Sequence, residues 1–109
     1  MTTSESKQPT KRDRESALQR AVKSLLRQLG IHYYVNTQGP IWGNVRGRPD
    51  MEVIYRGQTY YLELKRYREG KMSRYQEQER RKIEAAGAPY VVVREIKDVV
   101  EALGLNILI

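Results

Sequence analysis

Three charged residues near the middle of the chain have the types and the spacing of a site for metal-assisted phosphate chemistry. They lie in the stretch GRPDMEVIYRGQTYYLELKRY, residues 47–67, where Asp50 opens one apolar segment and Glu63 and Lys65 close the next. Mg²⁺ prefers one or two carboxylates together with water and substrate phosphate oxygens. A bound ion can acidify an attacking water, and a neighbouring lysine can orient that water or stabilise the developing negative charge. The alternative is a solvent-exposed hairpin face with an ordinary Glu–Lys pair.

The composition narrows the kind of metal and of partner that such a site can have. The chain has no cysteine and one histidine, His32, which excludes disulfides, thiolate zinc sites and a cluster of histidine ligands. We therefore expect a hard ion held by carboxylates, Mg²⁺ or Mn²⁺. Lysine and arginine number 20 against 13 acidic residues, and the net charge is +7. This excess favours a polyanionic partner, most simply nucleic acid, over a basic surface that serves solubility alone.

The ends of the chain and its apolar runs indicate its domain organisation and its location. Residues 1–12 are polar and lack a periodic apolar pattern, so we expect a flexible tail followed by a single domain over residues 13–109. No apolar run approaches the roughly 20 residues of a membrane span, and the first residues lack the apolar segment of a signal peptide. We therefore expect an intracellular protein without a membrane partner.

The apolar pattern predicts an α/β fold in which helices flank a mixed sheet. Apolar residues recur at helical spacing in three segments, and short β-branched or aromatic runs predict four strands. The run YVVVR is apolar throughout, which is typical of a strand near the centre of a sheet. The predicted order, α-β-β-β-α-β-α, comprises a helix at 15–29, strands at 31–36, 50–55 and 58–65, a helix at 73–86, a strand at 90–94 and a helix at 96–103.

The turn between the second and third strands decides where the charged trio lies. Arg-Gly at 56–57 predicts a two-residue turn, which places Asp50 opposite Glu63 with Lys65 on the same face. A four-residue loop would instead place Asp50 opposite Lys65, and either register gathers the trio. A three-residue loop is disfavoured because it breaks the apolar match. In the favoured register the other face carries the apolar pairs Met51–Leu62 and Val53–Tyr60.

Two facing carboxylates need a cation. Two like charges about 4 Å apart repel by roughly 4 kcal/mol at an effective dielectric constant near 20, and facing like charges destabilise a strand pair. Lys65 can offset part of this repulsion. A divalent ion can offset more of it, which is a second reason to expect a metal between Asp50 and Glu63.

These residues and their context resemble a known nuclease signature. The dipeptide PD at 49–50 and the tripeptide ELK at 63–65 are separated by 12 residues, in the manner of the PD-(D/E)XK motif. A preceding helix carries Glu15, and the helix after the ELK strand carries Gln76. Over about residues 14–103 the arrangement resembles the virus-type replication-repair nuclease (VRR-Nuc) domain, a branch of the PD-(D/E)XK superfamily with a restriction-endonuclease-like core that is related to Holliday junction resolvases.

The resemblance implies a reaction and a set of site residues. The implied reaction is Mg²⁺- or Mn²⁺-dependent hydrolysis of phosphodiester bonds in branched DNA, of Holliday junction or flap type, by a homodimer. Glu52 departs from the pattern, because an apolar residue is more usual there. By resemblance the metal ligands are Asp50, Glu63, the backbone carbonyl of Leu64 and Glu15, and the catalytic residues are Asp50, Glu63, Lys65 and Gln76.

Two of these residues also have simpler explanations. Glu15 lies in the first turn of its helix, where an acid interacts favourably with the helix dipole, although it shares a stripe with core residues. Ser73 and Gln76 form an S-x-x-Q capping box, which explains both residues without catalysis.

Basic residues flank both ends of the motif and are candidates for contact with the DNA backbone. Arginine suits phosphate because its guanidinium binds two oxygens at once. Trp42 in the glycine-rich loop is expected either to cover the core or to stack on a base. The candidate phosphate contacts are Arg46, Arg48, Arg66, Arg68, Lys71 and Arg74.

Three functions remain in competition at this point. The leading hypothesis is a structure-selective DNA endonuclease. The second is a non-catalytic nucleic-acid-binding domain that keeps the nuclease fold, which the intact acid-acid-lysine set argues against. A sequence-specific restriction enzyme ranks last, because 109 residues leave little chain for base readout.

Overall fold

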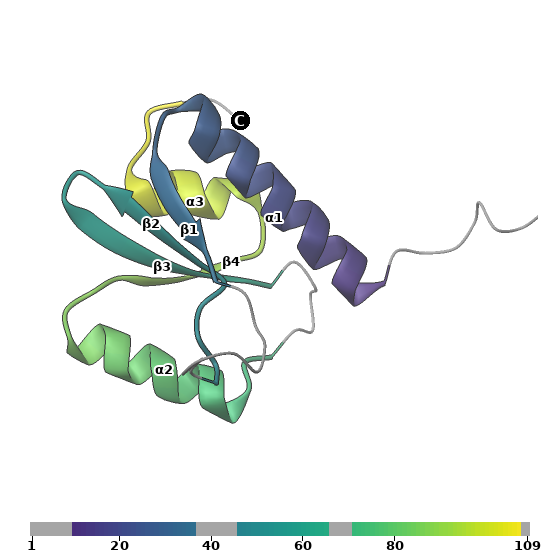
Figure 1. The fold of residues 1–109 in the computed structure, drawn as a ribbon, viewed down its shortest axis with the longest axis vertical. Coiled ribbons are helices and arrows are strands. Elements are labelled where there is room, and N and C mark those ends of the chain that lie inside the picture. The colour runs from purple at the N-terminus through teal and green to yellow at the C-terminus, as the bar shows by residue number, and fades with distance from the viewer. Residues whose placement is uncertain (1–9, 37–45, 66–70, 108–109) are drawn as a thin grey trace, which may run out of the picture.

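The computed structural model describes residues 10–36, 46–65 and 71–107, and its elements follow the predicted order α-β-β-β-α-β-α (Figure 1). The predictions for Trp42, Arg66, Arg68 and most of the expected tail lie outside the described residues. None of the helices in the described part is long and apolar enough to cross a membrane. The elements are α1 (Lys11–Gln28), β1 (His32–Val35), β2 (Met51–Tyr55), β3 (Gln58–Leu64), α2 (Arg74–Ala85), β4 (Tyr90–Val93) and α3 (Ile96–Leu103).

The four strands form one mixed sheet in the order β1-β2-β3-β4. β1, β2 and β3 are antiparallel to one another in turn, whereas β4 runs parallel to β3 after the crossover through α2. The predicted α/β fold with a mixed sheet is therefore confirmed. The central position expected for the strand at 90–94 is wrong, because β4 is an edge strand of this sheet. β4 packs against both α2 and α3. Helices that cover the faces of a strand favour apolar residues even when the strand has a neighbour on one side only.

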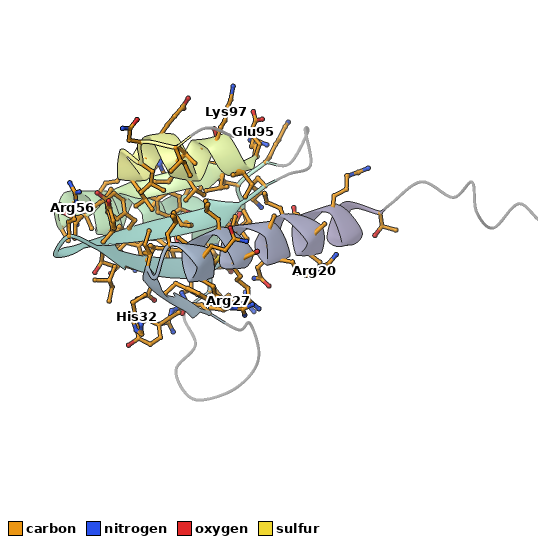
Figure 2. All side chains as sticks on the ribbon, turned by 90° about the horizontal axis from the view of Figure 1, so that it is seen from above. Arg20, Arg27, His32, Arg56, Glu95 and Lys97 are labelled. Carbon is orange, nitrogen blue, oxygen red and sulfur yellow. The ribbon has the colours of Figure 1, made fainter. Side chains whose placement is uncertain are left out.

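The helices cover the two faces of the sheet unequally. α1 and α3 lie together on one face, and α2 lies on the other (Figure 1). Leu18, Val22 and Leu26 of α1 are fully buried against the inner residues of the sheet. Charged side chains such as Arg20, Arg27 and Lys97 project outward from this core (Figure 2). The core thus fixes the side of β2 and β3 that faces α1, and leaves the other side to face α2.

The hairpin has the two-residue turn that the sequence predicts. Met51 pairs with Leu62 and Tyr55 pairs with Gln58, which confirms the favoured register. Arg56 and Gly57 both have positive φ, 51° and 78°, as the twist of a tight hairpin turn requires. This register places Asp50 and Glu63 one position beyond the Met51–Leu62 pair, at the end of the hairpin away from the turn.

The start of α1 differs from the prediction. The helix begins at Lys11 and not at Glu15, so it includes two residues expected in the tail. Glu15 is therefore the fifth residue of α1, and the prediction that it lies in the first turn is wrong. Residues 11–14, Lys-Arg-Asp-Arg, contain no apolar residue and therefore give no periodic signal. Extending an existing helix adds one hydrogen bond for each residue fixed, so polar residues can continue it.

Candidate active site

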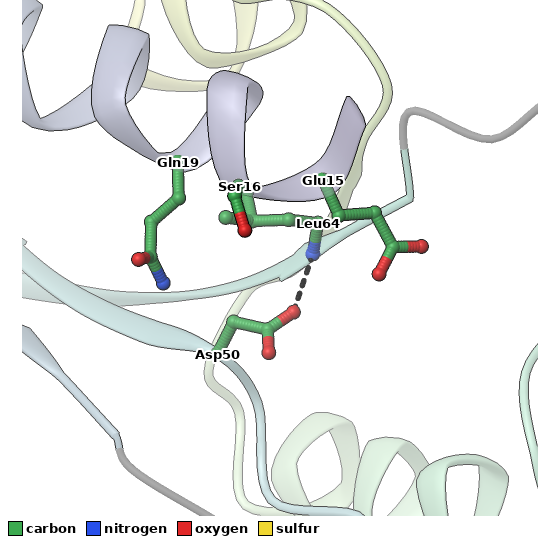
Figure 3. A pocket seen from close by; sticks show the side chains of 5 residues that line it. All are labelled: Glu15, Ser16, Gln19, Asp50 and Leu64. Atoms are coloured by element: carbon green, nitrogen blue, oxygen red, sulfur yellow. Dashed lines mark hydrogen bonds between the residues drawn. The ribbon is translucent and has the colours of Figure 1, made fainter. Parts of the chain in front are cut away.

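A pocket of about 380 Å³ opens where β2 begins, β3 ends and the first turns of α1 and α2 approach the sheet. A smaller cavity of about 130 Å³ between α1 and the sheet adjoins it, and the two share Glu15, Asp50 and Leu64 (Figure 3). The larger pocket collects all of the predicted catalytic and metal-binding residues. Its lining consists of Glu15, Arg46, Gly47, Arg48, Asp50, Glu63, Leu64, Lys65, Ser73, Tyr75 and Gln76.

Asp50 is tied to the end of the neighbouring strand. Its Oδ2 accepts a hydrogen bond of 2.8 Å from the backbone N–H of Leu64 (Figure 3). The side chain of Leu64 is buried in the core, so this bond links the carboxylate to a rigid part of the sheet. Asp50 is thereby held beside Glu63, the residue that precedes Leu64.

Glu63 and Lys65 are buried charged residues. Their exposed fractions are 2% and 7%, and Lys65 Nζ lies 3.7 Å from Glu63 Oε2. Ionised groups are rarely buried to this extent unless they are paired or hold a metal. One lysine partner at 3.7 Å leaves the second carboxylate, Asp50, without full compensation.

The surroundings of the pocket raise the pKa of both carboxyls. Burial and the nearby Asp50 carboxylate raise the pKa of Glu63 to about 8, with Lys65 opposing the shift. Burial also raises the pKa of Asp50, although the Leu64 N–H, Glu63 and Lys65 all act to lower it. Two carboxyls that cannot both ionise easily form a site that gains strongly from a divalent cation.

Gln76 has two roles at once. Its backbone N–H donates to Ser73 Oγ at 3.1 Å, and its own Oε1 accepts from the Ser73 N–H at 2.7 Å, which completes the capping box of α2. Its Nε2 donates to Glu63 Oε2 at 2.7 Å. The capping interpretation is therefore confirmed, and the same side chain also holds one oxygen of Glu63 toward α2.

The residues present fit a divalent ion held by two carboxylates. Within the described residues, Glu63 Oε1 and Glu15 Oε2 are buried oxygens with no hydrogen-bond partner. An ion or an ordered water satisfies such atoms. No group of three acidic or histidine side chains in the described part of the chain converges closely enough to hold one metal. The carboxylates that such an ion would meet are Asp50 and Glu63, with Glu15 nearby on α1, and this set fits the one or two carboxylates that Mg²⁺ prefers.

The segment before Asp50 packs directly on the start of α2. Gly47 has a φ of +79°, and a Cβ at this position would collide with the backbone of Tyr75 and Gln76. Arg46 Nη1 donates to the Tyr75 hydroxyl at 3.0 Å, and the guanidinium groups of Arg46 and Arg74 both lie over the Tyr75 ring. Two of the candidate phosphate contacts are thus gathered on one aromatic side chain at the rim of the pocket.

Arg48 and Glu52 pair beside the pocket. Arg48 Nη2 lies 3.2 Å from Glu52 Oε2, and the same oxygen accepts from Asn36 Nδ2 at 3.0 Å. Glu52 does not line the pocket of Asp50 and Glu63 but a smaller one beside it. The extra acid of the motif therefore lies outside the lining of the candidate metal pocket, and it neutralises part of the charge of Arg48.

Several residues of the site gave little signal in the sequence. Gly47 resembles any loop glycine until its contact with α2 is known. Arg94 donates from Nη1 to the backbone carbonyl of Lys65 at 3.0 Å, a link between residues 29 positions apart. Tyr90 is buried, but its hydroxyl has no hydrogen-bond partner among the described residues. Burial and the nearby Glu63 carboxylate raise the pKa of that hydroxyl.

The comparisons with known proteins bear on the fold. No family model and no curated protein matches the sequence. A solved structure described as "VRR_NUC domain" superposes with a TM-score of 0.67 and 24% sequence identity, over 86% of this chain and 98% of that chain. The similarity extends over nearly the whole of that domain, so this chain has the fold of that domain.

Proposed function

We propose that this chain, which has the fold of a VRR-Nuc nuclease domain, is a metal-dependent endodeoxyribonuclease that hydrolyses phosphodiester bonds in branched DNA. The observation that carries the proposal is the gathering of two carboxyls, Asp50 and Glu63, in one pocket with the buried Lys65, whose Nζ lies 3.7 Å from Glu63 Oε2. Two buried carboxyls destabilise a protein when no cation compensates their charge. Such clusters are therefore typical of functional sites. A basic rim and a net charge of +7 supply attraction for a polyanion.

Asp50 and Glu63 are the proposed ligands of Mg²⁺ or Mn²⁺, together with the backbone carbonyl of Leu64. When bound, the ion supplies positive charge for the phosphate oxygens and lowers the pKa of a water. Gln76 holds Glu63 Oε2 in place, and Glu63 Oε1, which has no hydrogen-bond partner among the described residues, is the oxygen left to bind the ion. Glu15 is proposed to assist from α1 by accepting from water in the same pocket.

Lys65 is the proposed catalytic lysine. Lys65 lines the pocket, and its Nζ lies 3.7 Å from Glu63 Oε2. With an ion held by Asp50 and Glu63, its ammonium would donate to a phosphate oxygen or to the attacking water. Burial strengthens such electrostatic interactions because little water competes with them. Arg46, Arg48 and Arg74 at the rim are proposed to bind neighbouring phosphates.

The proposed preference for branched DNA rests on the resemblance to junction-resolving enzymes. One small domain with one carboxylate pair can cut one strand, so symmetrical cleavage of a four-way junction needs two copies. We therefore propose a homodimer with one active site in each subunit.

The test is a cleavage assay on four-way junction, flap, nicked and linear duplex DNA in Mg²⁺, Mn²⁺ and EDTA, alongside a measurement of oligomeric mass. We expect metal-dependent cutting of a branched substrate that Lys65→Ala abolishes while DNA binding is largely retained. Turnover in Lys65→Ala would remove the lysine from the mechanism, and equal cutting of all four substrates would remove the branch preference.

One observation favours a second candidate, a non-catalytic DNA-binding domain. Arg46 and Arg48 line the pocket, and their guanidinium groups suit phosphate contact whether or not the site holds an ion. Tight binding to branched DNA without cutting in any metal would establish this alternative and overturn the nuclease.

A further inference from the structure

A second, open groove lies on the other side of the first turn of α2. Its volume is about 780 Å³, and it runs between α2, β4 and the start of α3. Ser73 and Gln76 of the α2 N-terminus line the active-site pocket, whereas the adjoining Met72 and Glu77 line this groove. The two depressions therefore share one wall. The groove is lined by Lys71, Met72, Glu77, Arg80, Val92, Arg94 and Asp98.

Arg94 connects this groove to the active site. Its Nη1 donates to the Lys65 carbonyl at 3.0 Å, and the Lys65 N–H donates to the Val93 carbonyl at 2.8 Å. Val93, at the end of β4, thus binds the backbone N–H of Lys65, and the next residue, Arg94, binds its backbone carbonyl. The position of Lys65 depends on the side chain that also lines the groove.

The groove carries a net positive charge, with three cations against the two acids Glu77 and Asp98. Lys71, Arg80 and Arg94 are its cations. The Asp98 carboxylate accepts from the backbone N–H groups of Arg94 and Glu95, so this acid is engaged by the start of α3.

Arg80 is held in place on the wall of the groove. Its guanidinium lies 5.5 Å from the centre of the Tyr90 ring, and its pair with Glu84 is exposed and therefore weak. Among the groove residues, Glu77 and Asp98 are the acids that oppose an anionic ligand, and two backbone N–H groups offset part of the Asp98 charge.

We propose that this groove binds the phosphodiester backbone of the DNA strand that continues from the scissile phosphate. The strand crosses the first turn of α2, with Arg46 and Arg74 on one side and Lys71, Arg80 and Arg94 on the other. Arg94 is in addition a positioning residue for Lys65. This inference rests on the proposed function in that it names DNA as the ligand, and it adds a second contact surface to the active site.

The direct test is the salt dependence of DNA binding in EDTA, where no cleavage occurs. Removal of one phosphate-binding cation reduces the slope of log K against log salt by about 0.9 for duplex DNA and about 0.7 for single strands. We expect this reduction for Lys71→Gln and for Arg80→Gln. The matched control is Arg56→Gln at the hairpin turn, which removes the same charge at the far end of the hairpin (Figure 2).

The outcomes separate the groove from the nuclease proposal. If Lys71→Gln and Arg80→Gln have the same slope of log K against log salt as Arg56→Gln, DNA does not bind in the groove. This conclusion holds whether or not the protein cuts DNA. Lys71 is exposed, so its variant reports on binding even if Arg80→Gln loses stability through its contact with Tyr90.

The positioning role of Arg94 is tested by kinetics. Arg94→Gln is expected to lower kcat several-fold as well as the salt slope, because Lys65 loses a backbone partner. Lys71→Gln is expected to raise KM and to leave kcat unchanged. An unchanged kcat in Arg94→Gln would refute the positioning role.

Discussion

Asp50 and Glu63 are the residues on whose chemistry the proposed function depends, and their properties follow from burial and from each other. Glu63 is almost fully buried, with Gln76 on one oxygen and Lys65 at 3.7 Å from the same oxygen. Its other oxygen has no hydrogen-bond partner among the described residues. A carboxyl in this environment holds its proton unless a cation replaces it, which makes the pH dependence of stability informative.

The metal-free protein is expected to lose stability as the pH rises from about 5 to about 8. The pKa of Glu63 rises from its ordinary 4.5 to about 8, so in this window the folded state holds a proton that the unfolded state has released. The contribution is fully present below 4.5 and is lost as the pH passes 8, with a slope of at most about 1.4 kcal/mol per pH unit for one proton. Urea denaturation in EDTA between about pH 5 and about pH 9 measures this slope. A flat or rising profile would contradict the raised pKa.

Asp50→Asn is expected to stabilise the metal-free protein at about pH 8 and to abolish cleavage. The asparagine side-chain oxygen can still accept from the Leu64 N–H, while one of the two like charges is gone. A gain of about 1 kcal/mol raises the melting temperature by about 4–8 °C in a domain of this size.

The control for Asp50→Asn is Asp98→Asn, which makes the same change at the start of α3, away from the carboxyl pair. We expect no stabilisation there. A clear drop in melting temperature for Asp50→Asn would disprove the repulsion between Asp50 and Glu63.

The first turn of α2 is the element that organises the site. It supplies Gln76 to Glu63, receives Gly47 against its backbone, and separates the pocket from the basic groove. Two pairs of variants test whether this turn acts through its stability or through the positions of side chains.

Ser73→Ala and Gln76→Ala remove the two halves of the same capping box. Loss of the Ser73 cap is expected to cost about 0.5–2 kcal/mol of stability. Gln76→Ala also removes the donor to Glu63, and the loss of such a supporting partner typically lowers metal affinity or activity about 10–100-fold. Denaturation and Mn²⁺-dependent cleavage measured on both variants separate these effects. Equal activity in the two would reduce Gln76 to a helix cap.

Gly47→Ala and Gly57→Ala form a second pair, because their glycines have closely similar φ values of +79° and +78°. An added Cβ collides with the α2 backbone at position 47 and meets open space at position 57. Both variants are strained in their backbone, but only Gly47→Ala displaces the loop before Asp50 from α2. We expect a larger loss of melting temperature and of cleavage for Gly47→Ala, measured by thermal denaturation and by the junction assay. Equal losses would show that the contact with α2 is not important.

The sequence could predict those parts of the fold that depend on local patterns. The two-residue turn at 56–57 and the alternation along the hairpin were enough to bring Asp50 and Glu63 together. The capping box of Ser73 was likewise local. The polar start of α1 gave no periodicity, and the apolar run of β4 could not distinguish an edge strand with covered faces from a central one.

Contacts between distant segments were beyond local patterns. Nothing near Gly47 in the sequence indicates that α2 packs on it, and nothing near Arg94 indicates that it reaches Lys65. The Asp50–Glu63 pair was predictable because one hairpin carries both residues. The residues that support it come from elements far along the chain.

At the scale of the whole molecule, the basic charge is expected to govern affinity for DNA. If about five or six phosphates are neutralised, the slope of log K against log salt should be roughly −5. Binding titrations between about 50 mM and about 300 mM salt measure this slope. A slope near zero would exclude a phosphate-dominated interface and with it the role of the basic rim and groove.

The central claim is that the Asp50–Glu63 pair captures a divalent cation in place of a proton. Calorimetric titration of Mn²⁺ near neutral pH, in two buffers of different ionisation heat, tests it most directly. We predict one ion bound per chain with release of a proton, and loss of both in Asp50→Asn and in Glu63→Gln. Absence of Mn²⁺ binding, or binding that both variants retain, would contradict this claim.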